Sequence, residues 1–193
     1  MWKTRAKLRL RAGRKSYILK YMIPHLVQIR ALAQEKEEEN WKFRQFLKLR
    51  CRLGSSEIDK RVFKTTERVW AGIDCTTCAN CCREVTPTFS EEEVSRLLGM
   101  TRQQFLDAHM EHTEGAEENP WRTRVKPCPF LKDNRCSVYE DRPGDCRGYP
   151  YLGEPDFAFR TIGMIKRTFT CPIVYEVMEE LKPSLGFSRK NRR

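Results

Sequence analysis

Apolar residues recur every three or four positions in several segments of the chain, and this spacing predicts short amphipathic helices. Residues 55–71 begin with Ser56 and Asp59, which can form a capping box, and continue with apolar residues at helical spacing. Residues 172–181 carry a second apolar stripe, and residues 35–54 carry a less regular one. We therefore expect a helix over each of these three segments.

Two more helix starts lie in the middle of the sequence. Ser90 and Glu93 can form a capping box before an apolar face that ends at Gly99, and residues 101–104 repeat this device. These starts predict two further short helices. The polar residues 112–126 that follow contain glycine and proline, so we expect a loop there.

Extended segments are few and short. Residues 127–139 resemble two strands around a Lys-Asp-Asn turn at 132–134, because Asp and Asn tolerate left-handed backbone and bond to it locally. Residues 86–88 and 157–161 are further strand candidates, whereas the Pro- and Gly-rich residues 140–151 predict irregular structure. Together these patterns indicate a small, irregular α+β domain of short helices around a hairpin.

Charge divides the chain of 193 residues, with its net charge of +11, into three parts. Residues 1–54 carry a net charge of +11, residues 55–183 carry −4, and residues 184–193 carry +4. Of the nine cysteines, all except Cys51 lie in the middle part. We therefore expect a basic, partly helical N-terminal extension, a cysteine-rich domain and a basic C-terminal tail, with these boundaries.

The sequence has neither a predicted membrane span nor a predicted signal peptide. No run approaches the ~18 apolar residues that a membrane span requires, and the N-terminus lacks the apolar block of a signal peptide. These features predict a cytoplasmic protein. In a reducing compartment cysteines are more often metal ligands than disulfide partners.

Four of the cysteines lie within eight residues, in the string CTTCANCC at 75–82. Cys75, Cys78 and Cys81 recur at a three-residue spacing, so their sulfurs can converge on one point. Cys82 must point elsewhere, to a second centre or to the opposite edge of the first. The later cysteines bring the candidate ligands to eight, and zinc and iron sites commonly use four thiolates each. These later cysteines are Cys128, Cys136, Cys146 and Cys171.

These motifs closely resemble the zinc- or iron-chelating CxxCxxCC domain of the YkgJ-type cysteine cluster proteins. The resemblance rests on residues 75–82, on the stretch CPFLKDNRCSVYEDRPGDCRGYPY at 128–151 and on Cys171-Pro172, and it spans about residues 57–182. It implies a metal-organised domain in which all eight cysteines are ligands. A related cluster occurs in flagellin lysine methylases, so the resemblance also admits an enzyme.

The metal is either an iron–sulfur cluster or zinc. The C-x2-C-x2-C spacing with a remote fourth cysteine is typical of ferredoxin-type clusters, and we expect Cys128 or Cys146 to be that fourth ligand. The remaining cysteines would hold zinc or a second cluster. Zinc alone is the competing interpretation, because it accepts many ligand spacings. The spacing slightly favours iron–sulfur, since the chain has no second CxxC pair.

Three arginines, Arg83, Arg142 and Arg147, flank the cysteines. Four thiolates on a divalent ion leave a net negative charge, which nearby cations would offset. The alternative is that these arginines form ordinary salt bridges with neighbouring acidic residues, namely Glu84, Asp141 and Asp145.

For other polar residues near the motif we expect structural or surface roles rather than roles in metal binding. His109 and His112 have metal-compatible spacing but are expected at the surface, because thiols are already abundant. Asp74 is expected to cap a turn. The tyrosines of the later motif are expected to pack its loop; they are Tyr139, Tyr149 and Tyr151.

Metal binding is therefore the first functional hypothesis. An enzyme related to the flagellin methylases is the second, although the chain has no Gly-rich nucleotide loop, Ser/His/Asp triad or paired-carboxylate signature. The third is binding of nucleic acid or an anionic surface through the basic residues 1–54.

Overall fold

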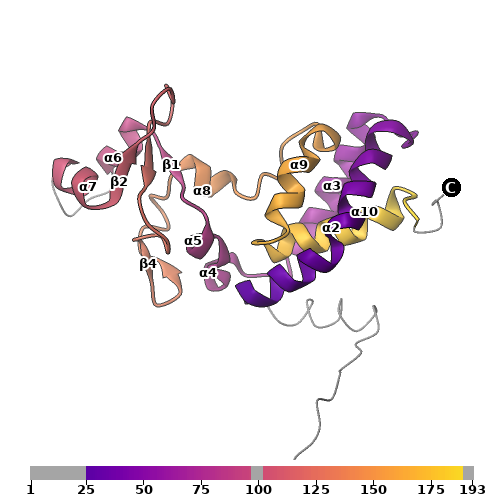
Figure 1. Cartoon of the computed structure of the whole chain (residues 1–193), viewed down its shortest axis with the longest axis horizontal. Coiled ribbons are helices and arrows are strands. Elements are labelled where there is room, and N and C mark those ends of the chain that lie inside the picture. Colours follow the sequence, from indigo (N-terminus) through magenta and orange to yellow (C-terminus); the bar gives the residue numbers. More distant parts are fainter. Residues whose placement is uncertain (1–24, 97–101, 189–193) are drawn as a thin grey trace, which may run out of the picture.

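The computed structural model describes residues 25–96 and 102–188, and it confirms the α+β class. Long helices gather at one end of the molecule, and short helices and strands lie at the other (Figure 1). The long helices are α2 (Leu26–Leu49), α3 (Ser55–Trp70), α9 (Phe157–Arg167) and α10 (Pro172–Ser184).

The four long helices share one apolar core. Helix α10 packs mainly on α3, and α2 packs mainly on α9. Each helix buries one apolar stripe, as its sequence pattern requires. The largest contributors from α2, α3, α9 and α10 are Phe43, Leu47, Ile58, Val62, Phe157, Met164, Ile165, Met178 and Leu181.

The predicted strand at 157–161 is wrong, because these residues open helix α9. The buried positions of α9 continue at helical spacing to Met164 and Ile165, beyond the short window that resembled a strand. The N-terminus of the helix is held from α3. The Asp59 carboxylate accepts hydrogen bonds from the backbone N–H of Asp156 at 2.8 Å and of Phe157 at 3.0 Å.

Helix α3 confirms the predicted helix at 55–71, but its predicted capping box is wrong. The helix begins at Ser55 behind Gly54, and no side chain caps it. Asp59 is already engaged with the start of α9, which lies almost 100 residues later in the chain.

Helix α2 begins earlier than the predicted helix at 35–54 and contributes to the same core as α3. The division of the chain at residue 54 stays a prediction, although side chains from both sides of it pack together. Most of the basic N-terminal segment, residues 1–24, and the end of the basic tail lie outside the described residues.

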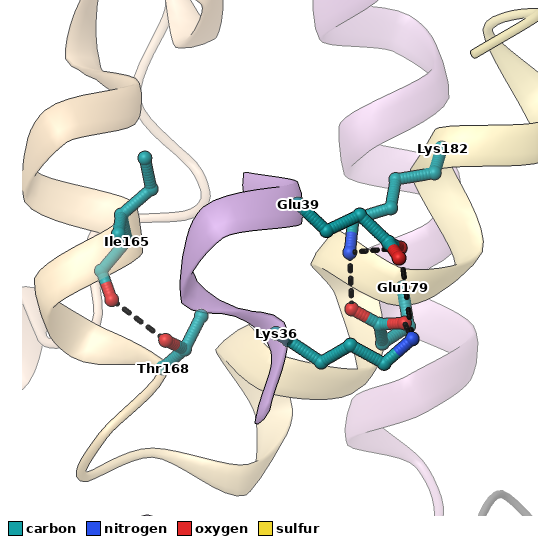
Figure 2. A network of polar contacts seen from close by, with 6 residues as sticks. All are labelled: Lys36, Glu39, Ile165, Thr168, Glu179 and Lys182. Carbon is teal, nitrogen blue, oxygen red and sulfur yellow. Dashed lines mark hydrogen bonds and ion pairs between the residues drawn. The ribbon is translucent and has the colours of Figure 1, made fainter. Parts of the chain in front are cut away.

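Salt bridges join α2 to α10 beside this core, as Figure 2 shows. The ammonium of Lys182, which is almost fully buried, lies 2.9 Å from the Glu39 carboxylate and also contacts Glu179. Lys36 in turn lies 3.0 Å from Glu179. A buried lysine is tolerated here because two carboxylates compensate its charge.

The opposite end of the molecule has its own small core. Strands β1 (Thr88–Phe89), β3 (Trp121–Thr123) and β2 (Met110–His112) form an antiparallel sheet in that order. Helices α6 (Glu91–Arg96) and α7 (Arg102–His109) lie beside the sheet. The core side chains are Phe89, Val94, Phe105, Leu106 and Met110.

At this end of the molecule, the structure confirms one predicted helix cap and corrects one predicted loop. The Ser90 hydroxyl accepts from the Glu93 N–H, and the Glu93 carboxylate accepts from the Ser90 N–H, which is the predicted capping box. The predicted repeat of this device begins at residue 101, outside the described residues. The expected loop at 112–126 contains strand β3, because Trp121 pairs with both Phe89 and His112.

The predicted hairpin is confirmed. Strand β4 (Leu131–Lys132) pairs with β5 (Arg135–Cys136), and Leu131 lies opposite Cys136. Asp133 and Asn134 in the turn have φ angles of 45° and 64°, the left-handed conformation that these residue types tolerate. Short helix α8 (Gly144–Gly148) interrupts the segment expected to be irregular. Within residues 25–96 and 102–188, no helix has both the length and the apolar character that crossing a membrane requires.

Candidate metal centre

The CTTCANCC string folds into two helical turns with a sharp break between them. Helix α4 (Cys75–Cys78) is followed by Ala79 with a φ of 52° and then by α5 (Asn80–Glu84). Asp74 caps α4 as expected, since its carboxylate accepts from the Thr76 N–H at 2.8 Å. The left-handed residue redirects the chain between the second and third cysteines of the string.

All eight cysteines of the motif line one partly enclosed cavity of about 260 Å³. Cys51 is not among the residues that line this cavity, and it packs against the helical core instead. Helices α4, α5 and α8, strand β5 and the start of α10 each supply ligand candidates, so residues almost 100 positions apart converge there. Their role as metal ligands stays a prediction.

The cysteines converge without forming a finished site for a single ion. In the described part of the chain, no three His, Cys, Asp or Glu side chains are already placed to hold one metal ion. Zn–S bonds of about 2.3 Å would bring four thiolates to about 3.8 Å from one another.

Four of the thiols are coupled to one another electrostatically, and we call them the first thiol group: Cys75, Cys78, Cys81 and Cys171. A thiolate at Cys75 or Cys78 would raise the pKa of Cys171, and a thiolate at Cys171 or Cys78 would raise the pKa of Cys81. Cys171 is buried at the N-terminus of α10, and Cys75 packs against the same core. Cys171 is thus electrostatically coupled to the three-residue-spaced cysteines, and the identity of the fourth ligand, for which the sequence suggested Cys128 or Cys146, stays a prediction.

The other four thiols lie on the side of the hairpin and α8, and we call them the second thiol group: Cys82, Cys128, Cys136 and Cys146. A thiolate at any of the three other cysteines of this group would raise the pKa of Cys146. Cys128 interacts with Cys82 and Cys136, and Cys136 interacts with Cys82. Every pair in the second thiol group is therefore in electrostatic contact.

The two groups meet at the adjacent residues Cys81 and Cys82. The thiol of Cys81 donates a hydrogen bond to the sulfur of Cys82, which lowers the pKa of Cys82 and raises the pKa of Cys81. Cys78 also has Cys82 as a charged neighbour. Among the eight thiols, the interactions between the two groups all involve Cys82.

Burial keeps most of these thiols protonated in the absence of a cation. It raises the pKa of Cys75 and of Cys128 to about 11 and the pKa of Cys171 to about 12, because a thiolate loses hydration there. Metal ligation requires the thiolate form, so binding must release protons.

Backbone N–H groups already face several of the sulfurs. Each belongs to a residue two or three positions after its cysteine, and each favours the thiolate, against the burial that raises these pKa values. Such N–H···S hydrogen bonds stabilise and tune metal-bound thiolates. The pairs are Asn80 with Cys78, Phe130 with Cys128, Val138 with Cys136, and Ile173 and Val174 with Cys171.

The three flanking arginines were predicted either to offset thiolate charge or to form ordinary salt bridges, and the structure contains both arrangements. Arg142 is a favourable charged neighbour of thiols in both groups and lies 3.9 Å above the Tyr139 ring. Arg83 likewise stabilises the thiolate forms of Cys78 and Cys82. Arg147 forms a salt bridge of 3.7 Å, but with Glu93 rather than with the acidic residues named from the sequence.

One buried polar atom at the cavity lacks a partner. The hydroxyl of Tyr149 is buried without a hydrogen bond, and Tyr149 lines the cavity. Burial raises the pKa of Tyr149, and Cys171, Cys81 and Cys78 raise it further. Sequence reasoning treated this tyrosine as packing, and its position before Pro150 gave no signal of a role at the first thiol group.

Comparison with known proteins agrees with the geometry. Residues 74–172 match the family model CxxCxxCC, described as "Putative zinc- or iron-chelating domain". The match covers just over half of the chain and contains all eight cavity cysteines. No curated protein and no solved structure matches the chain.

Proposed function

The chain belongs to the CxxCxxCC family, and we propose that it is a metal-binding protein that chelates iron or zinc through its eight cavity cysteines. The observation that carries this proposal is the convergence of all eight thiols on one cavity. Cysteines kept only for packing would have no reason to meet there, because a buried free thiol behaves as a small hydrophobe.

The surroundings of the thiols suit a bound cation. Backbone N–H groups and the side chains of Arg83 and Arg142 favour the thiolate form. Burial opposes it, since uncompensated buried charge is costly. A metal ion removes this conflict by supplying the missing positive charge.

Iron–sulfur is the favoured metal form, and zinc is the alternative. The C-x2-C-x2-C spacing followed by a remote Cys171-Pro172 has the features of ferredoxin-type ligand runs, in which a cysteine before proline is also a ligand.

Complete ligation by cysteine favours a binding, structural or electron-transfer role over catalysis. A catalytic zinc keeps one coordination position open for water or substrate, whereas a metal with four thiolates has none. The catalytic alternative drawn from the flagellin methylases stays a prediction, as does binding of nucleic acid by the basic residues 1–54.

Metal analysis of anaerobically purified full-length protein tests the proposal. We expect a brown solution with iron and acid-labile sulfide; a colourless protein with stoichiometric zinc would keep metal binding and reject the cluster. Cys51→Ser should retain the metal content of the wild type and Cys78→Ser should lose much of it. Protein that holds no metal, even after reconstitution with iron and sulfide or with zinc, would overturn the proposal.

A further inference from the structure

We propose that a second cavity, of about 780 Å³, binds a small organic anion in which a carboxylate or phosphate group is attached to an apolar or aromatic body. This open cavity lies between α9 and the segment that follows α8, which connects the two ends of the molecule in Figure 1. We call it the arginine cavity, because Arg160 and Arg167 of α9 line it. Its volume is within the range of about 300–1,000 Å³ that is usual for small-molecule sites.

The arginine cavity is separate from the cysteines but adjacent to them. None of the described residues that line it is a cysteine, so this inference goes beyond metal binding and does not depend on it. Val85, Asp145, Tyr149 and Thr170 line both cavities. A ligand in the arginine cavity would therefore lie next to the candidate metal centre.

Both arginines are half-buried, and neither forms a salt bridge within residues 25–96 and 102–188. The Arg160 guanidinium donates to the backbone carbonyl of Tyr151 at 2.9 Å and to that of Pro155 at 2.6 Å. These carbonyls satisfy its N–H groups but do not neutralise its charge. The Arg167 guanidinium lies 4.8 Å from the centroid of the Tyr151 ring, which is likewise neutral.

The charge of the lining favours an anion. Lys166 raises the number of cations to three, against the carboxylates of Asp145 and Glu154. Asp145 is already engaged, because it accepts a hydrogen bond from the Thr88 N–H at 3.0 Å. Glu154 is exposed, so water screens its charge. A bound anion would supply the counter-charge that the half-buried guanidinium groups lack.

The position of Arg167 is fixed by close packing around Tyr151. A Cβ atom at Gly163 would lie 2.5 Å from Nη1 of Arg167, and one at Gly148 would lie 2.9 Å from the Tyr151 ring, so both glycines leave room that these side chains fill. Tyr151 has a φ of 63°, which is uncommon outside glycine, and its hydroxyl contacts the Asp145 carboxylate. A guanidinium held in this way loses little freedom when a ligand binds.

The chemistry of the lining indicates the class of ligand. A guanidinium is planar and pairs with carboxylate or phosphate through two parallel hydrogen bonds. The same helix lines the cavity with Met164 and with two exposed apolar side chains, Phe159 at 68% and Ile162 at 40% exposure. Phe159 and Ile162 would contact an apolar or aromatic body attached to the anionic group.

Calorimetric titration of full-length protein with phenyl phosphate and with benzoate tests the site. We expect saturable binding of one equivalent of at least one of these anions and no binding of benzyl alcohol, which has the same ring without the charge. Inorganic phosphate should bind more weakly than phenyl phosphate, because it lacks the ring. Wild-type protein that binds neither aromatic anion, or that binds benzyl alcohol equally well, would overturn the proposal.

Substitutions of arginine locate the binding. Arg167→Gln removes the charge and should weaken binding of the anion by about 10-fold or more. Arg52→Gln is the matched control, because Arg52 is exposed and lines neither cavity. An affinity that falls in Arg142→Gln, at the cysteine cavity, but not in Arg167→Gln would place the anion elsewhere and overturn the proposal.

Gly163→Ala tests the same contact without changing any charge. The added Cβ must displace the end of the Arg167 side chain, which is flexible, and alanine favours the helix, so the variant should fold. Binding should weaken while the melting temperature is retained. Gly54→Ala is the control, because nothing lies within 4 Å of a Cβ there. Unchanged affinity in both Arg167→Gln and Gly163→Ala would reject the arginine cavity as the site.

Discussion

The backbone N–H of Cys128 donates a hydrogen bond to the carbonyl oxygen of Cys82 at 2.7 Å. This bond joins the segment that opens the β4–β5 hairpin to the end of the cysteine string, although Cys82 and Cys128 are 46 positions apart in the sequence. It brings two residues of the second thiol group, Cys82 and Cys128, together through the backbone alone. Part of the site is therefore assembled by main-chain structure, before any metal contributes.

Arg142 should strengthen metal retention. Its guanidinium is a charged neighbour of Cys75, Cys82 and Cys136, so Arg142→Ala removes positive charge that offsets the thiolates. Loss of such outer contacts typically weakens metal binding by about 10- to 100-fold. Competition with a chromophoric chelator measures the change, and Arg96→Ala, at an exposed pair with Glu92, is the control. Equal affinity in both variants would contradict this role.

Tyr149 should tune a metal bound at the first thiol group rather than hold it. Its unpartnered hydroxyl has Cys171, Cys81 and Cys78 as neighbours, and a hydrogen bond from it to a thiolate would stabilise the reduced, more negative state of a cluster. Tyr149→Phe should keep the metal content and shift the reduction potential to a more negative value. Voltammetry of the reconstituted protein measures the shift, and Tyr139→Phe should leave the potential unchanged. An unshifted potential in Tyr149→Phe would rule out the hydrogen bond.

Asp59 should contribute strongly to stability, because it joins α3 to the first turn of α9. Asp59→Ala leaves the N–H groups of Asp156 and Phe157 without their carboxylate partner. The loss of charge-assisted hydrogen bonds at a buried site should lower the free energy of unfolding by about 2–3 kcal/mol. Denaturant unfolding measures this, with Glu67→Ala on the exposed face of α3 as the control. A change as small as that of the control would refute the cap.

Glu176 should make stability depend on pH. Burial raises its pKa from 4.5 to about 7, and the nearby Glu180 and Glu179 add to the increase. The folded state therefore binds this proton more tightly than the unfolded state, so stability is lost as the pH rises from about 4.5 to about 7.

A glutamine at position 176 would not ionise, so Glu176→Gln should be more stable than wild type at pH 8. After allowance for partial exposure, we expect a gain of about 1–3 kcal/mol. The gain should shrink toward zero near pH 5, and thermal or denaturant unfolding at both values measures it. A gain that is the same at both pH values would show that ionisation of Glu176 is not its cause.

Several features of this protein follow from the sequence by itself. The Asp133-Asn134 turn, the Ser90–Glu93 cap and the helix at 172–181 depend on neighbours within a few residues, and the structure confirms all three. The cysteine string is local in the same sense, since its spacing already indicates converging thiols. Such patterns are predictable because their geometry is set by short stretches of backbone.

Tertiary structure decided what depends on contacts between distant segments. Residues 157–161 form a helix because α9 packs on α2 and α3 and because Asp59 caps its start from another helix. Likewise, Cys171 lies in the helical core, against which Cys75 also packs, because α10 begins there. Sequence spacing carries no information about which remote ligand approaches a site, because packing of the whole chain determines that choice.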